Sequence, residues 1–302
     1  MKKFFVALGK GLLYVLLYFG AQVIVSIVAA LIISFQIGYQ NARSGIEYDA
    51  MKVAETMTQR LLGKTVIITL VASIIILVVL IIEFLIRKKS FFKEIKFEKM
   101  NPAYIIPIIF LGIGMNFLTS SLMEVLPIPE KLMEQYMEQS SMLNSGNMAF
   151  NFILIVFVAP LVEEVVFRGL VFTRFQKGMP IVLSATLSAL IFGLAHGQII
   201  WMTYAFILGL VLSLVFVKTK SLVGNILLHF TFNLTSGIMM LMKIEETSEN
   251  TNLIFLIASI GVTILSLVAI LYLTKKSNQI IEEKLSWLKL ILINSILISK
   301  LV

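Results

Sequence analysis

Apolar residues fill long runs of this chain, and the segments between the runs hold most of its charges. A helix rises 1.5 Å per residue, so about 20 apolar residues are needed to cross the ~30 Å hydrocarbon core of a bilayer. The pattern therefore predicts an all-α fold, a polytopic bundle of about eight transmembrane helices. We expect these helices at residues 11–35, 65–86, 102–122, 148–172, 180–198, 200–217, 222–243 and 253–274.

Three further stretches are too short or too charged to cross a membrane. Segments 47–62 and 130–143 carry mixed charge and are predicted to lie as amphipathic helices on the outer surface. The tail, residues 282–302, is predicted to be an interfacial C-terminal helix and not a ninth span. Because neither an internal repeat nor a linker divides the sequence, residues 1–302 are predicted to form a single integral membrane domain.

The composition agrees with a membrane protein and excludes several functions. The chain is 59% hydrophobic and 14% charged, whereas a soluble domain is roughly half apolar and a quarter charged. The absence of cysteine excludes disulfides and thiolate chemistry. Although the net charge is +8, the basic residues flank the apolar runs, so nucleic acid is not an expected partner. The expected partners are membrane lipids and a membrane-associated protein or peptide substrate, and the oligomeric state is left open.

The distribution of basic residues also predicts the orientation, because cytoplasmic loops of membrane proteins are rich in Lys and Arg. The basic segment 87–99 and the pair Lys275–Lys276 then lie inside, and the acid-rich segments 130–134 and 245–249 lie outside. Residues 36–64, with four basic side chains, fit this orientation poorly. We expect a multi-pass protein of a bacterial cell membrane, with both termini in the cytoplasm.

Three charged residues interrupt the apolar segment 157–172: Glu163, Glu164 and Arg168. Each charge costs roughly 2.5–3.5 kcal/mol at the centre of a membrane helix, so such a cluster is kept when it is paired, hydrated or used. Glu164 and Arg168 are four residues apart and can form an ion pair on one helix face. Glu163 lies about 100° away and is predicted to act as a general base or acid. The alternative is a purely structural ion pair between helices.

Both histidines of the chain also lie in predicted membrane helices. Phe192 and His196 share one helix face, and His229 and Asn233 share another, each pair at a spacing of four residues. Taken singly, each pair also fits a satisfied core histidine or a polar contact between helices. Taken together with Glu163, they suit the activation of water by Glu163 and His196. The amide and the second imidazole would then stabilise an oxyanion.

The ordered motifs Glu-Glu-x-x-x-Arg, Phe-x-x-x-His and His-x-x-x-Asn resemble the CPBP family, which comprises CAAX-processing proteases and bacteriocin-processing (Abi) proteins. The resemblance covers residues 125–243, which we expect to be the catalytic core. It implies an intramembrane endopeptidase, a hydrolase that acts on peptide bonds. In this family the first glutamate and the histidine of the second motif are thought to activate water, and the third motif to bind the oxyanion. The residues carried over are Glu163, His196, His229 and Asn233 as catalytic, with Glu164, Arg168 and Phe192 in support.

A metal mechanism is the alternative to this scheme. Glu163, His196 and His229 offer three ligands, which is the number that a catalytic zinc uses. However, the usual His-Glu-x-x-His signature is absent from the sequence. We therefore favour a metal-free mechanism with no cofactor, and keep a divalent metal such as zinc as the alternative.

The expected function is hydrolysis of a peptide bond near the cytoplasmic face of the membrane. One alternative is a non-enzymatic, peptide-binding protein for bacteriocin self-immunity, and a less favoured one is an ion-coupled transporter, which usually shows repeated halves. Helix counting raises one conflict with the cytoplasmic site. It places His196 ~24 Å along its helix from Pro180 but Glu163 only ~14 Å from its cytoplasmic helix end.

Overall fold

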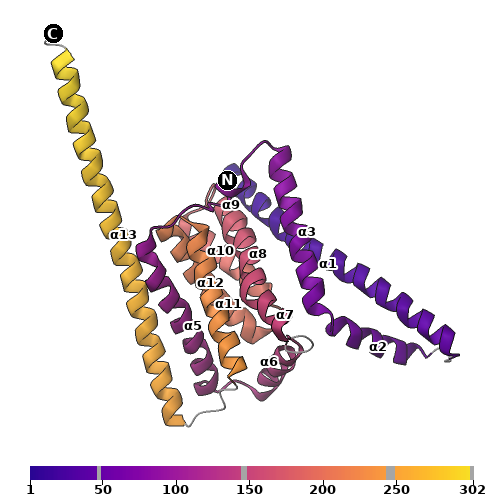
Figure 1. Ribbon diagram of the computed structural model, residues 1–302. Coiled ribbons are helices and arrows are strands. Elements are labelled where there is room, and N and C mark those ends of the chain that lie inside the picture. The colour runs from indigo at the N-terminus through magenta and orange to yellow at the C-terminus, as the bar shows by residue number, and fades with distance from the viewer. Residues whose placement is uncertain (46–48, 144–147, 243–248, 300–302) are drawn as a thin grey trace.

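A computed structural model describes residues 1–45, 49–143, 148–242 and 249–299 of the chain. Within these residues every regular element is a helix (Figure 1). Seven helical segments are long and apolar enough to cross a membrane, and α10 (Ile181–Leu194) is an eighth, shorter apolar helix. The predicted all-α, polytopic bundle of about eight helices is therefore confirmed. The seven long segments are α1 (Lys2–Ser44), α3 (Thr65–Ile86), Pro102–Val125, Met148–Phe175, α11 (Ile199–Thr219), α12 (Leu222–Leu241) and Leu253–Gln279.

The segment Met148–Phe175, here called the central span, is not a uniform α-helix. Two π-helical stretches interrupt its α-helical hydrogen bonding, and such stretches occur frequently at functional sites. Pro160 follows the first of them, and its missing N–H removes one backbone hydrogen bond. The parts of the span are α7 (Met148–Ile153), η2 (Leu154–Val158), α8 (Ala159–Glu164), η3 (Val165–Phe172) and α9 (Thr173–Phe175).

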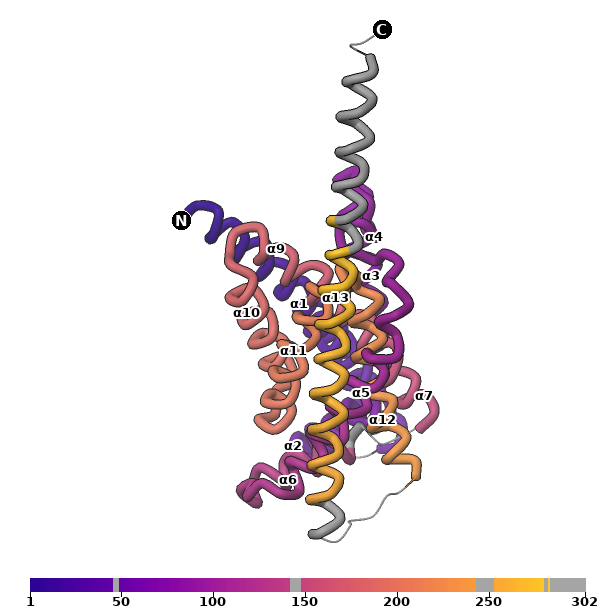
Figure 2. The backbone as a smooth tube through the Cα atoms, turned by 90° about the vertical axis from the view of Figure 1, so that its left-hand side faces the viewer, coloured from indigo at the N-terminus to yellow at the C-terminus, as the bar shows by residue number. Residues whose placement is uncertain are grey.

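Short helices lie at both ends of the bundle, as Figures 1 and 2 show. At one end are α2 (Ala50–Leu62), α6 (Glu130–Leu143) and the α10–α11 connection; we call this the α2–α6 end. At the other are the N-terminus, α4 (Phe91–Glu94), η1 (Pro102–Tyr104) and the residues that follow α9; we call this the lysine-rich end. Both α2 and α6 are separate, non-spanning helices, as the sequence predicted. Asp49 begins α2 by accepting hydrogen bonds from the backbone N–H groups of Met51 and Lys52.

The central span packs in the middle of the fold. Phe167, Phe172 and Phe175 are completely buried, and the span as a whole contacts α1, α3, α10 and α11. The helices α5 (Ile105–Val125), α12 and α13 (Glu249–Ser299) form the other side of the bundle. Gly112 and Gly114 of α5 allow this close packing, since a Cβ at either position would lie under 3.0 Å from a threonine of α12 or α13.

Two boundaries differ from the predicted ones in a way that matters. The helix expected to extend to residue 198 ends at Leu194, because Gly197 adopts a positive φ of 73° that reverses the chain into α11. At the C-terminus, α13 runs unbroken from Glu249 to Ser299. The tail is therefore not a separate helix, and its placement at the membrane interface stays a prediction.

Candidate active site

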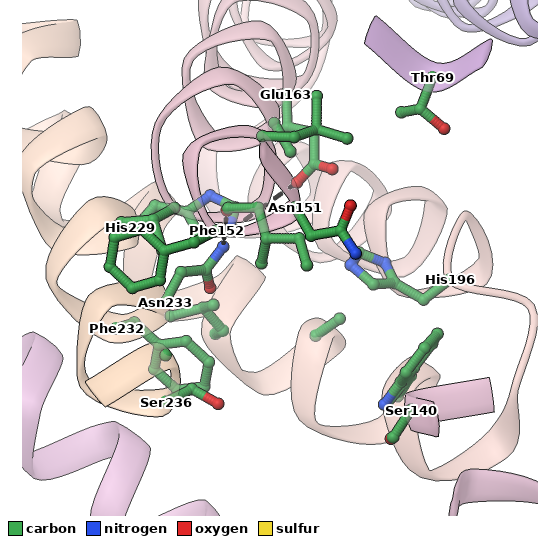
Figure 3. Close-up of a pocket in the computed structure, with 18 of the residues that line it drawn as sticks. Thr69, Ser140, Asn151, Phe152, Glu163, His196, His229, Phe232, Asn233 and Ser236 are labelled. Atoms are coloured by element: carbon green, nitrogen blue, oxygen red, sulfur yellow. Dashed lines mark hydrogen bonds and ion pairs between the residues drawn. The ribbon is translucent and has the colours of Figure 1, made fainter. Parts of the chain in front are cut away.

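A cavity of about 460 Å³ lies between α3, α6, the central span, the α10–α11 connection and α12. Its lining contains all four residues predicted to be catalytic, Glu163, His196, His229 and Asn233, and Figure 3 shows Glu163 and His196 at different sides of it. Three separate motifs, spread over 70 residues of sequence, are thus brought to one place. The catalytic roles of these residues stay predictions.

Behind the cavity, Glu164 is the centre of a completely buried polar network. One of its oxygens, Oε1, accepts hydrogen bonds from Arg168 Nη1 and from His229 Nδ1, each at 2.9 Å. The other, Oε2, accepts from Asn225 Nδ2 at 3.2 Å. The predicted ion pair between Glu164 and Arg168 is therefore present, with both side chains 0% exposed. Removing one partner of such a pair costs about 3–5 kcal/mol, because the other charge is left buried.

Phe192 joins this network to the two histidines. The Arg168 guanidinium lies over the Phe192 ring, 4.2 Å from its centroid. The ring also meets His196 edge-on at 4.9 Å and His229 at 5.8 Å. A cation over a desolvated aromatic face contributes about 2 kcal/mol. Gly209 of α11 makes room for the guanidinium, since a Cβ there would lie 3.1 Å from Arg168 Nη2.

The carboxylate of Glu164 determines how the His229 ring is used. A carboxylate only accepts hydrogen bonds, so His229 Nδ1 carries the hydrogen. The opposite nitrogen, Nε2, then faces Glu163 Oε2 at 3.8 Å. This distance is too long for a hydrogen bond and leaves both groups available to a water or a substrate atom between them.

The neighbouring Glu163 has a different environment from Glu164. Its side chain is 17% exposed, and it points into the cavity from α8 (Figure 3). Glu163 lies near the positive charge of Arg168 without forming the direct bond that Glu164 makes. The predicted separation of the two carboxylates, one paired and one facing the site, is therefore present.

His196 lies just beyond the end of α10, in the α10–α11 connection, and lines the cavity. Its Nδ1 is 2.8 Å from the carbonyl oxygen of Phe192, which can only accept, so Nδ1 carries the hydrogen. In the neutral ring, Nε2 is then a proton acceptor. The cavity lies near this end of α10 and not near Pro180, which agrees with the long distance counted from Pro180 to His196.

Asn233 reaches the cavity from α12 and also completes the central span. In η2 the N–H of Ala159 bonds to the Leu154 carbonyl, five residues back. The next such bond would run from Pro160 to Ile155, but proline has no N–H. Asn233 Nδ2 donates to this freed Ile155 carbonyl at 2.8 Å. One amide hydrogen therefore makes the polar contact between helices, and the second is left for an acceptor in the cavity.

The sequence prediction missed Asn225, although a signal for it was present. Asn225, His229 and Asn233 follow each other at intervals of four residues, so they share one face of α12. Asn225 is completely buried and donates both to Glu164 and, at 2.7 Å, to the carbonyl of Leu212. It therefore fixes the position of the Glu164 carboxylate.

Whether the site works with or without a metal stays a prediction. Within the described ranges, no group of three or more His, Cys, Asp or Glu side chains is placed to hold a metal ion. Glu163, His196 and His229 line the same cavity without forming such a group. No reaction step is therefore derived through a metal.

The position of the cavity along the bundle brings two of the predictions into conflict. Its lining includes Thr65 at the start of α3, Ser140 of α6, Trp201 in the first turn of α11 and Met240 in the last turn of α12. All of these lie toward the α2–α6 end. With the N-terminus in the cytoplasm, this end would lie outside, so the predicted orientation and the predicted site near the cytoplasmic face do not fit together. Counting residues along the helices could not predict the position of the cavity, because it does not show at which end the helices separate.

Comparison with known proteins finds similarity over the segment that carries the site. Residues 145–235 match the family model of type II CAAX prenyl endopeptidase, Rce1-like. Over 107 residues, 32% of this chain, the sequence is 34% identical to the membrane-embedded CAAX protease MroQ of Staphylococcus aureus (strain USA300). The match spans 43% of that relative, which is less than half of its length. No solved structure matches the chain. The segment that carries all the predicted site residues is therefore similar to CAAX proteases, as its motifs suggested.

Proposed function

We propose that this protein is an intramembrane endopeptidase that hydrolyses a peptide bond of a membrane-associated protein or peptide without a metal. The observation that carries the proposal is the shared cavity. It joins a carboxylate, Glu163, to the free Nε2 sides of His196 and His229. The family match supports a protease, and membrane lipids and the substrate peptide are the expected partners.

In this mechanism Glu163 and His196 hold the attacking water. Glu163 removes a proton as the water oxygen forms a bond to the substrate carbonyl carbon. When the carbon–nitrogen bond breaks, this proton passes to the leaving amine, and the water oxygen stays on the new carboxyl group. The nucleophile is thus made at the cavity wall where Glu163 is exposed.

The developing oxyanion accepts hydrogen bonds from the second amide hydrogen of Asn233 and from Nε2 of a protonated His229. Glu164 is a positioning residue here, because it orients His229 and does not touch the substrate.

The test is to incubate the detergent-purified protein with a mixed pool of membrane-derived and prenylated peptides and to identify new termini by mass spectrometry. Glu163→Gln should yield none of the termini that the wild type produces. The matched control is Glu83→Gln on α3, because Glu83 is a second intramembrane carboxylate outside the cavity, bonded to Tyr14 at 3.1 Å and Arg87 at 2.6 Å. This control should cleave like the wild type.

Equal cleavage by Glu163→Gln and the wild type would overturn the mechanism. Peptide binding without cleavage, in the wild type and in Glu163→Gln alike, would support a non-enzymatic immunity protein instead.

A further inference from the structure

The two ends of the bundle differ in charge. The α2–α6 end carries the exposed glutamates Glu130, Glu134 and Glu138 on α6. It also carries the basic residues of the α1–α2 region, of which Arg60 is hydrogen-bonded to Gln40 at 2.8 Å. Most other basic residues gather at the opposite, lysine-rich end: Lys2, Lys3, Arg87, Lys88, Lys89, Lys93, Lys96, Lys99, Arg174, Lys177, Lys218, Lys220, Lys275 and Lys276.

Several of these basic residues are held in place at the lysine-rich end. Glu94 of α4 bonds Arg174 Nη1 at 2.9 Å and lies 3.6 Å from Lys89 and 3.9 Å from Lys177. The hydrogen bond from Arg174 is the main cause that lowers the pKa of Glu94. Since cytoplasmic loops carry the excess of Lys and Arg, this end of the folded bundle lies in the cytoplasm.

The cavity is closed toward the lysine-rich end. Every residue from Glu164 to Phe175 is buried. The second half of the central span therefore blocks access to Glu163 from the lysine-rich end. Phe172 packs edge-on against Phe216 of α11, with the ring centroids 5.8 Å apart. The ammonium group of Lys96 lies over the same Phe216 ring, 5.2 Å from its centroid. A peptide on the cytoplasmic side therefore meets packed aromatic side chains and not the site.

At the α2–α6 end the cavity is bordered by an anchored surface helix. Gln198 accepts from the Trp201 backbone N–H at 2.9 Å and donates to the Leu132 carbonyl of α6 at 3.2 Å, which ties α6 to the start of α11. Tyr136 of α6 meets Trp201 edge-on at 6.1 Å, and both rings line the cavity. The exposed side of the site is thus built from α6 and the α10–α11 connection.

We infer that the active site opens to the non-cytoplasmic side of the membrane. Its substrates are then peptide segments presented on that side, either exported peptides or the outer juxtamembrane segments of membrane proteins, and not cytoplasmic C-terminal tails. The statement about substrates rests on the proposed protease function, whereas the statement about sidedness does not.

The absence of cysteine from the chain allows a direct test of sidedness. Single cysteines are introduced as Ser140→Cys in the cavity wall, Gln139→Cys at an exposed position beside it, and Ser90→Cys at the exposed lysine-rich end. Cells that express each full-length variant are treated with a membrane-impermeant maleimide before and after permeabilisation.

Gln139→Cys and Ser140→Cys should label in intact cells, and Ser90→Cys only after permeabilisation. If Gln139→Cys labels only after permeabilisation while Ser90→Cys labels in intact cells, the inference is wrong. Gln139→Cys decides the result even where Ser140→Cys is shielded by α6.

A second measurement separates sidedness from catalysis. A charged, membrane-impermeant peptide that the detergent-purified protein cleaves is added outside intact cells. The wild type should cleave it there, and Glu163→Gln should not. Cleavage only after permeabilisation would overturn the substrate inference and leave the protease function intact. If Gln139→Cys labels in intact cells but no peptide is cleaved under any condition, the inference about sidedness stands and the proposed protease function is wrong.

Discussion

The two halves of the central span differ in accessibility. The half toward the α2–α6 end borders the cavity, the other half is tightly packed, and the boundary falls between Glu163 and Glu164. On the α2–α6 side, Glu163 is 17% exposed in a cavity with both histidines; on the lysine-rich side, Glu164 is 0% exposed and fully bonded. One helix thus presents an accessible carboxylate and, next to it, a buried and hydrogen-bonded one. The buried charges hold His229 and Phe192 in place before a substrate binds, which is what electrostatic catalysis requires.

Besides the loss expected for Glu163→Gln, the largest expected effect concerns His196, at the accessible side of this boundary. His196→Ala should reduce cleavage by at least about 10²-fold, the usual contribution of a positioned general base or acid. The melting temperature should stay near that of the wild type, because the ring is only part-buried and its single bond is to a local carbonyl. Cleavage rates and melting curves of the purified variant check this, and wild-type cleavage by His196→Ala would exclude its role.

Asn233→Ala should lower kcat by about 10²-fold, since one oxyanion donor typically contributes this much or more. The same substitution removes the Asn233 donor from the Ile155 carbonyl, which Pro160 cannot replace because it has no N–H, so stability should also fall by roughly 1–3 kcal/mol. Asn233→Asp should lower kcat as well, because it keeps the size of the side chain but replaces both amide hydrogens by an acceptor. An unchanged kcat in both variants would contradict the oxyanion role.

On the tightly packed side, Glu164→Gln should destabilise the fold by about 3–5 kcal/mol, because it leaves the Arg168 charge buried without its partner. The double variant Glu164→Gln with Arg168→Met should recover a large part of this loss. Thermal unfolding in detergent measures both. If the double variant is less stable than the single one, the buried pair is not the source of the effect.

A smaller effect is expected at Glu94, which links α4 to the central span. Its pKa is lowered mainly by the hydrogen bond from Arg174, so its contribution to stability is present above the ordinary glutamate pKa of 4.5 and is lost as the pH falls through the lowered value. Between about pH 5 and pH 3 the wild type should therefore lose more melting temperature than Glu94→Gln. Parallel melting curves for the two proteins would disprove this contribution.

Chelation should have the smallest effect. Since the three candidate ligands do not form a metal-binding group in the described part of the chain, cleavage should be unchanged after treatment with a strong chelator and dialysis. The measurement is the rate of peptide cleavage before and after treatment. Loss of cleavage, with recovery on adding zinc, would assign Glu163, His196 and His229 to a metal site.

Much of the fold and the site was predictable from the sequence. Apolar runs of spanning length predict membrane helices because the backbone must satisfy its hydrogen bonds within the bilayer. The spacing of four residues likewise brings Glu164 to Arg168 and His229 to Asn233, since it depends on helix geometry alone. These local rules do not depend on how the helices pack, which is why the structure agrees with them.

What could not be predicted depends on tertiary packing. The π-helical stretches around α8 change which carbonyls are free, and only the position of Pro160 hints at them. The end of α10 could not be located from the hydrophobic pattern, because the apolar run continues past Gly197 into Ile199 and Ile200. The end at which the cavity opens depends on where the helices separate. The hydrophobic periodicity of the sequence does not predict this position.

The most direct test compares the two adjacent carboxylates in one experiment, by measuring cleavage and thermal unfolding of Glu163→Gln and Glu164→Gln beside the wild type. Glu163→Gln is expected to unfold like the wild type and to cleave nothing, whereas Glu164→Gln is expected to unfold at a clearly lower temperature. Cleavage by Glu163→Gln at the wild-type rate, or equal unfolding of all three proteins, would contradict the division of roles between Glu163 and Glu164.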